Sequence, residues 1–295
     1  MKKIICIAIW IGSLTYWAQA QTTTSFDIPF EIANGMIMVE ASVNGDTGTF
    51  VLDTGSPTIV VNSRNVSNLR LAEANPQTHM DKRLAVKVNH FRWADIERQD
   101  LQAIAMDISH LESASSKKIL GVIGFDVLRQ YELLFDFEHQ HLMMLPAKDN
   151  WVHRVNEPLH SLRFKMHGQL PVVKAEIAGV KLKLGMDTGG TNLLSEDLLD
   201  ELKAAQIGEL EKEKMMGFGH RTHYLPAAEL TGVELDGTPF DETRFVFDDL
   251  DYLEEQRIDG LLGLPFLAQF RFSINYRENR IYFWRYDAAL WGRRI

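Results

Sequence analysis

The 295-residue chain has one cysteine, Cys6, so it can form no intramolecular disulfide and offers no cysteine cluster for a metal. It also lacks a phosphate-binding glycine loop, a Gly-x-Ser-x-Gly motif and a basic stripe. These absences argue against the usual nucleotide-binding and serine hydrolase classes. The 40 acidic residues outnumber the 31 basic ones, for a formal net charge of −9, which makes nucleic acid a poor candidate partner.

Long apolar runs are missing as well. The longest one, residues 4–14, follows Lys2 and Lys3 and is succeeded by small residues near Ala18-Gln19-Ala20. This pattern predicts a signal peptide over residues 1–20, cut before Gln21. The alternative is an uncleaved membrane anchor, although the run is short for a bilayer span. We therefore expect an exported protein, periplasmic, cell-surface or secreted, whose mature form has no thiol and no stable membrane span.

The full sequence is 45% hydrophobic, and an internal repeat organises the part that follows the N-terminal segment. Residues 35–56 and the segment 134 positions further on share one plan: an apolar run, a turn centred on Gly45 or Gly179, and a second apolar run. An Asp-Thr-Gly turn follows each second run. This pattern predicts two equivalent β-hairpins.

The repeat resumes downstream at an offset of 139 residues. Residues 119–128 match residues 258–267, and residues 131–145 match residues 270–283, with apolar positions spaced by two. The spacing predicts paired strands, each preceded by a short helix. We expect Asp126 to cap the first of these helices and Pro265 to lie in the first turn of the second.

The two halves differ most in the middle of each repeat. Only the second half has a run that predicts an amphipathic helix, with Ser195 as N-cap and acidic residues in its first turn. The polar stretch 146–159 is the natural connector. We place the boundary near residue 155, with an N-terminal lobe at 21–155 and a C-terminal lobe at 156–295.

A lone Asp-Thr-Gly sequence after a strand is most simply a turn. Here two copies occupy equivalent places in a repeat, at residues 51–56 (Val-Leu-Asp-Thr-Gly-Ser) and 185–190 (Gly-Met-Asp-Thr-Gly-Gly). Each is followed by a Gly-apolar-apolar-Gly segment, within residues 119–124 and 258–263. Together these motifs resemble the pepsin and retropepsin superfamily of aspartic peptidases, and the resemblance covers nearly the whole mature chain.

The resemblance implies an all-β fold with two retropepsin-like β-barrel lobes and a few short helices. It assigns catalysis to Asp53 and Asp187, which meet between the lobes and activate a water molecule. Two carboxylates held close together cannot both ionise cheaply, so the pair should share one proton and titrate as a unit. Because one chain supplies both aspartates, we expect a monomer, and no cofactor is implied.

The resemblance also assigns roles to the residues that follow each aspartate. Thr54 and Thr188 would form a reciprocal hydrogen-bond arrangement that locks the two loops together. Gly55 and Gly189 would allow close backbone approach to the carboxylates.

One position breaks the symmetry of the motifs. In this superfamily Ser56 would bind the outer oxygen of Asp53 through its hydroxyl, whereas Gly190 has no hydroxyl to offer Asp187. We interpret Gly190 as an asymmetry between the two carboxylates.

Substrate binding in the superfamily uses a mobile hairpin, the flap. The second half offers candidate flap residues in a glycine-containing segment: Phe218, Gly219, His220 and Tyr224. The first half offers only residues 84–93, with Phe91 and Trp93. An ordinary surface hairpin is the alternative for the second segment.

The histidines invite a metal hypothesis, with His139 and His141 two residues apart and His220 and His223 three apart. Neither pair has an evident third ligand nearby, so a solvated strand or turn is favoured and no metal is expected.

The leading hypothesis is an aspartic endopeptidase that acts on peptides or proteins. The alternative is a catalytically inactive peptide-binding or scaffolding protein that has kept the fold, an idea to which Gly190 and the weakly marked first flap give some support. A glycosidase built on paired carboxylates would not explain the duplicated Asp-Thr-Gly context.

Overall fold

The computed structural model describes residues 25–67, 69–71, 84–148, 151–204, 209–216, 222–254 and 257–286. Within them the chain is mostly β-strand with a few short helices, in agreement with the all-β prediction. The signal peptide predicted at residues 1–20 lies outside the described residues.

An eight-stranded sheet forms the first lobe, in the order β2-β3-β4-β9-β5-β8-β7-β6. Because β3 pairs with β7 as well as with its neighbours, the sheet curls back on itself. Its strands are β2 (Glu31–Ala33), β3 (Met36–Val43), β4 (Asp46–Leu52), β5 (Val60–Asn62), β6 (Arg70–Leu71), β7 (Leu84–Trp93), β8 (Ile96–Met106) and β9 (Ile119–Ile123).

The second lobe has the equivalent pairings. Strand β14 runs parallel to β21 as β4 does to β9, and β13 pairs with β18 as β3 does with β7. Its strands are β13 (Leu170–Ile177), β14 (Val180–Met186), β15 (Leu193–Ser195), β16 (Glu211–Met216), β17 (Thr222–Leu230), β18 (Val233–Leu235), β19 (Thr238–Phe240), β20 (Thr243–Asp248) and β21 (Gly260–Leu262).

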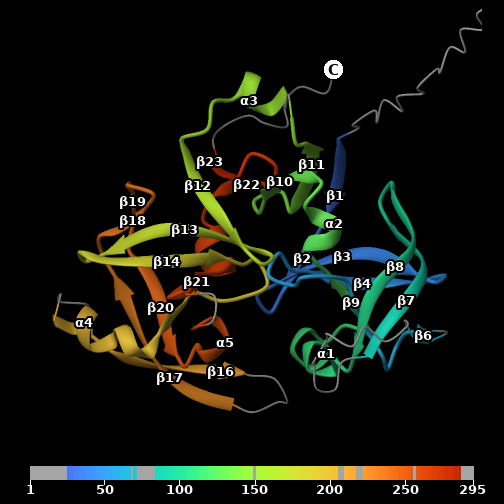
Figure 1. The fold of residues 1–295 in the computed structure, drawn as a ribbon, viewed down its shortest axis with the longest axis horizontal. Helices are drawn as coiled ribbons and strands as arrows, with labels where there is room; N and C mark the ends of the chain where they lie inside the picture. Colours follow the sequence, from blue (N-terminus) through green and yellow to red (C-terminus); the bar gives the residue numbers. More distant parts are fainter. Residues whose placement is uncertain are drawn as a thin grey trace, which may run out of the picture.

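Six strands from both halves form a central sheet, in the order β1-β11-β10-β22-β23-β12, which continues into the second lobe through β13. In Figure 1 it lies above and between the first lobe on the right and the second on the left. Its strands are β1 (Phe26–Pro29), β10 (Tyr131–Asp136), β11 (His141–Pro146), β12 (His160–His167), β22 (Arg271–Asn275) and β23 (Arg280–Trp284).

The central sheet joins the halves about a pseudo-twofold axis. Strands β10 and β22 are antiparallel, with Leu133 opposite Ile274 and Phe135 opposite Phe272, so repeat-equivalent residues exchange places across the pair. The rings of Phe135 and Phe272 stack at 4.9 Å, within one hydrophobic core that runs through both lobes. Packing between the halves is therefore continuous.

Both predicted hairpins are present as β3–β4 and β13–β14. Each turns through a glycine at positive φ, Gly45 at 94° and Gly179 at 86°, a conformation that glycine adopts at little cost. Each is preceded by one residue that is also left-handed, Asn44 or Ala178, as expected for a two-residue hairpin turn.

The helices are short and lie in the connections between strands. They are α1 (Ser109–Ser115), α2 (Phe125–Leu128), α3 (Trp151–Val155), the 3-10 helix η1 (Glu196–Leu198), α4 (Leu199–Ala204), α5 (Asp251–Glu254) and α6 (Leu264–Leu267). Among the described residues, no helix is long and apolar enough to cross a membrane. The predicted boundary near residue 155 falls between α3 and β12 and stays a prediction.

Two helix details differ from expectation. Asp126 does not cap α2: Gly124 holds the cap position, where a Cβ would lie 2.4 Å from the carbonyl oxygen of Thr58. Asp126 instead lies in the first turn and accepts a 2.7 Å hydrogen bond from Thr58. In the second half, Ser195 precedes η1 and then α4 without making a side-chain cap, whereas Pro265 does lie in the first turn of α6.

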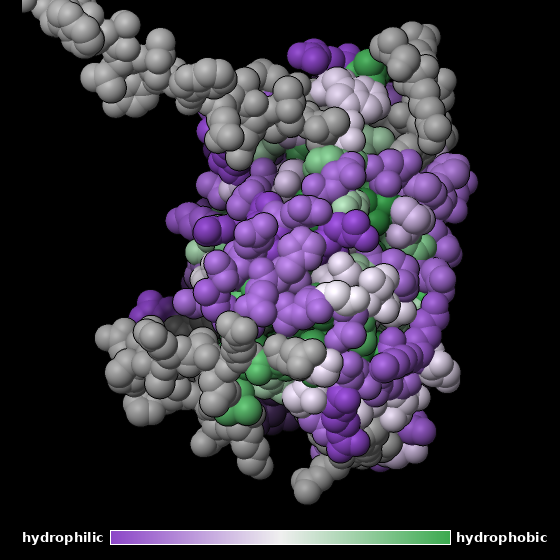
Figure 2. Space-filling model, turned by 90° about the vertical axis from the view of Figure 1, so that its right-hand side faces the viewer, coloured by the Kyte–Doolittle hydropathy of each residue, from purple (hydrophilic) through white to green (hydrophobic). Residues whose placement is uncertain are grey.

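The first lobe presents a largely hydrophilic face, with hydrophobic residues in small separate patches (Figure 2). Strand β7 has the matching burial pattern: Val86, Val88 and Phe91 point into the core, while intervening residues such as Lys87 are exposed. Among the described residues this face therefore has the pattern of a solvated sheet surface.

Candidate active site

Asp53 and Asp187 lie at equivalent points, each directly after the second strand of its hairpin. The backbone N–H of Asp53 donates to the carbonyl of Ile123 at 3.1 Å, and that of Asp187 donates to the carbonyl of Leu262 at 3.0 Å. Each aspartate is thus fixed to the Gly-apolar-apolar-Gly strand of its own lobe. The central sheet then holds the two lobes, and so the two loops, in place.

Two threonines bind the loops to each other. The N–H of Thr54 donates to Oγ1 of Thr188 at 3.1 Å, and the N–H of Thr188 donates to Oγ1 of Thr54 at 3.0 Å. Both threonines are fully buried, so losing either hydroxyl would leave a backbone N–H without a partner away from water.

The glycines of each loop lie directly against the opposite carboxylate. A Cβ on Gly55 would lie 2.6 Å from the carboxylate of Asp187, and one on Gly189 would lie 2.3 Å from Cγ of Asp53. Such distances exclude any side chain at both positions. The same close approach brings the carboxyl groups of Asp53 and Asp187 into hydrogen-bond contact with one another.

Short backbone hydrogen bonds to the two carboxylates differ in number, while the N–H of Gly55 also lowers the pKa of Asp187. Asp53 Oδ1 accepts from the N–H groups of Gly55 at 2.8 Å and Ser56 at 3.1 Å. Asp187 Oδ1 accepts from the N–H of Gly189 at 2.8 Å, whereas the N–H of Gly190 donates at 3.4 Å to the backbone carbonyl of Asp187. The environment of Asp53 therefore favours its ionised form more strongly.

The expected contact from the Ser56 hydroxyl to Asp53 is wrong in this structure. The hydroxyl donates to the carbonyl of Thr58 at 3.0 Å, and Ser56 reaches Asp53 through its backbone N–H. A Cβ on Gly190 would lie 3.1 Å from Oδ2 of Asp187, a tight contact that a small shift could accommodate.

The pKa values of the two carboxyl groups are displaced in the same direction. Burial raises the pKa of Asp53, while hydrogen bonds from Asp187, Gly55 and Ser56 oppose the rise. Burial also raises the pKa of Asp187, to well above its ordinary value of 3.8, and the nearby charge of Asp53 adds to the effect. The two carboxyl groups therefore titrate as one coupled unit that keeps a proton to higher pH than an isolated carboxyl group would.

Two neighbours of this site were not found by sequence reasoning. Burial, together with the charges of Asp187 and Asp53, raises the pKa of Tyr276, so its phenol stays neutral near the pair. The Tyr276 hydroxyl is buried and has no hydrogen-bond partner among the described residues. The other neighbour, Gln169, donates from Nε2 to the carbonyl of Gly55 at 2.8 Å.

The structure locates only part of the candidate flap. Tyr224 is an exposed residue of β17, opposite Lys214 of β16, while Phe218, Gly219 and His220 lie outside the described residues. In the first half, residues 84–93 form strand β7, where Phe91 and Trp93 are completely buried. Those two rings therefore belong to the lobe core and not to a mobile tip.

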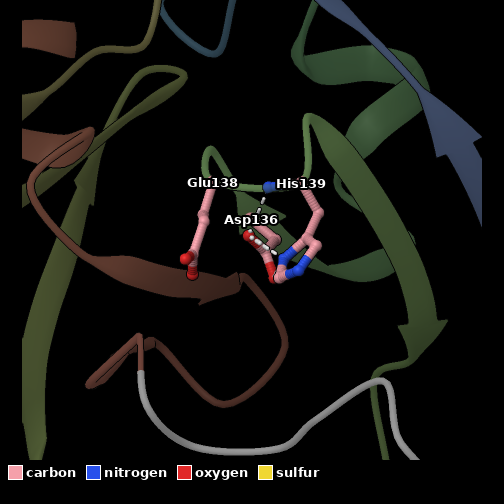
Figure 3. A group of neighbouring side chains, drawn as sticks. All are labelled: Asp136, Glu138 and His139. Carbon is pink, nitrogen blue, oxygen red and sulfur yellow. Dashed lines mark hydrogen bonds and ion pairs between the residues drawn. The ribbon is translucent and has the colours of Figure 1, made fainter.

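One group of possible metal ligands lies away from the aspartate pair, at Asp136, Glu138 and His139 (Figure 3). Nδ1 of His139 lies 3.1 Å from both carboxylate oxygens of Asp136, whereas Glu138 is exposed. Asp136 also pairs with the buried guanidinium of Arg271 at 2.6 Å. That carboxylate already has a cationic partner. His141, the second histidine of the pair noted in the sequence, is not part of this group, and its Nδ1 lies 2.6 Å from Oδ1 of Asp27.

Comparison with known proteins finds a family to which part of the first lobe is similar. A family model described as aspartyl protease matches residues 39–127, a segment that runs from β3 through the Asp53 loop to α2. This segment is therefore similar to an aspartyl protease, which supports the resemblance of the chain to the aspartic peptidase superfamily. No curated protein sequence matches the chain.

Proposed function

We propose that the protein is an aspartic endopeptidase that hydrolyses peptide bonds with a water molecule activated by Asp53 and Asp187. The observation that carries the proposal is the reciprocal packing of the loops. Each carboxylate lies against the glycine of the opposite loop, and the Thr54–Thr188 hydrogen bonds hold both loops in that position.

Amide hydrolysis needs a base to activate water and an acid to protonate the carbonyl oxygen and then the leaving nitrogen. Asp53, with two backbone N–H donors, is suited to be the ionised base. Asp187, with one short backbone hydrogen bond and a pKa that burial and Asp53 raise well above 3.8, is suited to hold the proton that polarises the substrate carbonyl. The pair thus supplies both functions with one shared proton, and no cofactor is needed.

The direct test uses the purified mature chain and a diverse peptide library between pH 3 and 8. Asp53→Asn and Asp187→Asn should each lower kcat/KM by at least about a hundredfold, because each removes one member of the acid-base pair. Asp95→Asn is the matched control, since Asp95 is exposed in the turn between β7 and β8. Equal cleavage by the wild type and both dyad variants would rule out the mechanism.

An inactive peptide-binding protein is the alternative. It predicts that labelled peptides bind to the wild type without being cleaved at any pH in the range. A statine-type inhibitor separates the two functions further, because it mimics the tetrahedral intermediate and should compete with substrate only if the pair is a working dyad.

We also propose that the protein is exported, on the basis of the N-terminal pattern of basic residues, apolar run and small residues. N-terminal sequencing of protein recovered from fractionated cells tests this proposal. The expected mature terminus is Gln21, outside the cytoplasmic fraction.

A further inference from the structure

The Asp53 loop accepts a hydrogen bond from a side chain of the other lobe, and the Asp187 loop has no equivalent contact among the described residues. Gln169 belongs to the turn between β12 and β13, and its side chain crosses from the second lobe to the first to hold the carbonyl of Gly55. The residue at the matching place in the first half, 134 positions earlier, is Gly35, in the turn between β2 and β3. Gly35 has no side chain, so the second loop cannot receive the same contact.

The geometry points to Gln169 as a positioning residue that holds the Gly55 peptide and thereby keeps the first catalytic loop distinct from the second. This inference rests on the proposed function for its role in catalysis. The hydrogen bond itself, from Nε2 to the Gly55 carbonyl at 2.8 Å, is independent of that function.

The physical effect passes through the backbone of the loop. The carbonyl of Gly55 and the N–H of Ser56 belong to one peptide group, and that N–H donates to Asp53 Oδ1. A donor on the carbonyl fixes the plane of this peptide and polarises it, which strengthens its N–H as a donor. Gln169 therefore stabilises the ionised form of Asp53 without touching the carboxylate.

Two titratable groups from other segments interact with Asp53: Asp187 from the loop after β14, and Tyr276, the residue directly after β22. On α2, Asp126 binds Thr58 further along the same loop. His167 lies two residues before Gln169 in the same hairpin, so its imidazole needs its own control.

The test compares Gln169→Ala, Gln169→Asn and Gln169→Glu with the wild type. Alanine has no donor and asparagine is one methylene too short, so both should move the lower titration step of the pair to higher pH, by about half a unit. Glutamate can donate only when protonated, so Gln169→Glu should match the wild type at acidic pH and the alanine variant above it. In turnover, kcat/KM of Gln169→Ala should fall about threefold to tenfold on the acidic limb, with little change in KM.

Titration is measured by carbon-13 NMR of labelled aspartate carboxyl groups, with the pair identified by the signals lost in Asp53→Asn and Asp187→Asn. Gln130→Ala is the matched control, since Gln130 is an exposed glutamine that binds Arg98. His167→Gln controls for the neighbouring imidazole by removing it. Melting temperatures of Gln169→Ala and Gln130→Ala should be alike.

Titration curves of Gln169→Ala that overlay the wild type would overturn the inference, and so would an equal shift in Gln130→Ala. A loss of melting temperature without a shift in titration would show a structural role only. Since the NMR measurement needs no turnover, it decides the role of Gln169 even if the wild type cleaves no peptide, the result that would refute the proposed function.

Discussion

At the scale of single residues, the inequality between Asp53 and Asp187 follows from a few backbone donors. Short hydrogen bonds reach Asp53 from two N–H groups and Asp187 from one, while the N–H of Gly55 also lowers the pKa of Asp187. Gly190 contributes to the difference, because a serine in its place would carry a hydroxyl close to Oδ2 of Asp187. The asymmetry of the pair can therefore be altered by one substitution.

We expect Gly190→Ser to shift the basic limb of the pH profile to lower pH. A hydroxyl donor stabilises the ionised form of Asp187 and so lowers its pKa, which burial and Asp53 hold well above 3.8. The shared proton is then lost at a lower pH, and activity falls with it. The measurement is kcat/KM against pH, with an expected shift of about half a unit.

Gly190→Ala is the control, because it adds the Cβ without the hydroxyl. That Cβ would lie 3.1 Å from Asp187 Oδ2, so a small adjustment is required in both variants. If alanine moves the basic limb as far as serine does, or if serine moves it upward, the hydrogen-bond explanation fails.

The sequence predicted which residues form this site better than it predicted the contacts that those residues make. The placement of Asp53 and Asp187 followed from the repeat, since equivalent hairpins end at equivalent points. The direction of the Ser56 hydroxyl could not be predicted, because the carbonyl of Thr58 competes for it in the folded loop. Gln169 was missed for a similar reason: its partner Gly55 is 114 residues away, and only the packing of the lobes brings them together.

At the scale of secondary-structure elements, the pairing of β10 with β22 carries the contact between the halves. One face of this strand pair is apolar, whereas the other face buries polar side chains that pair with one another across the two strands. Asp136 of β10 pairs with Arg271 of β22, and Glu132 of β10 accepts from Ser273 and Asn275 of β22. Complementary groups at both ends of the pair favour the observed register over a shifted one.

Arg271→Met should lower the free energy of unfolding by about 3–5 kcal/mol, because it leaves the carboxylate of Asp136 buried without its cation. Both side chains of the pair are almost fully buried, at 1% and 0% exposure. Urea denaturation at pH 7 measures the loss. The double variant Asp136→Asn/Arg271→Met should recover part of it, since no unpaired charge remains.

Arg280→Met is the matched control for this prediction. Arg280 lies on the neighbouring strand β23, binds Ser161 at an exposed position, and should change the free energy of unfolding by less than about 0.5 kcal/mol. A similar cost for both arginine variants would mean that the lost packing of a long side chain, and not the buried carboxylate, sets the effect.

Secondary-structure elements could be predicted from the sequence where residues close together in the chain determine them. Apolar positions spaced by two and glycine-centred turns predicted the four hairpins β3–β4, β13–β14, β10–β11 and β22–β23. The central sheet was not predicted, because alternation identifies a strand but not its partner in the other half. The cap of α2 was also missed, since Gly124 is required there by the close approach of the Thr58 carbonyl, a tertiary contact.

At the scale of the whole molecule, both halves of the site come from one chain. The Thr54–Thr188 hydrogen bonds and the β10–β22 pairing are intramolecular, so the pair forms without a second subunit. A site shared between two subunits would instead be lost on dilution as the subunits dissociate.

We therefore expect specific activity to stay constant as the enzyme is diluted over about three orders of magnitude. The measurement is initial rate divided by enzyme concentration, with sedimentation velocity at the highest concentration to report the oligomeric state. Specific activity that falls in proportion to concentration would show that a dimer is the active form, contrary to this expectation.

A catalytic test of the same point mixes Asp53→Asn with Asp187→Asn. If each chain carries a complete site, the mixture stays inactive, whereas a site shared between chains would regain activity from pairs that combine the intact Asp187 of one variant with the intact Asp53 of the other.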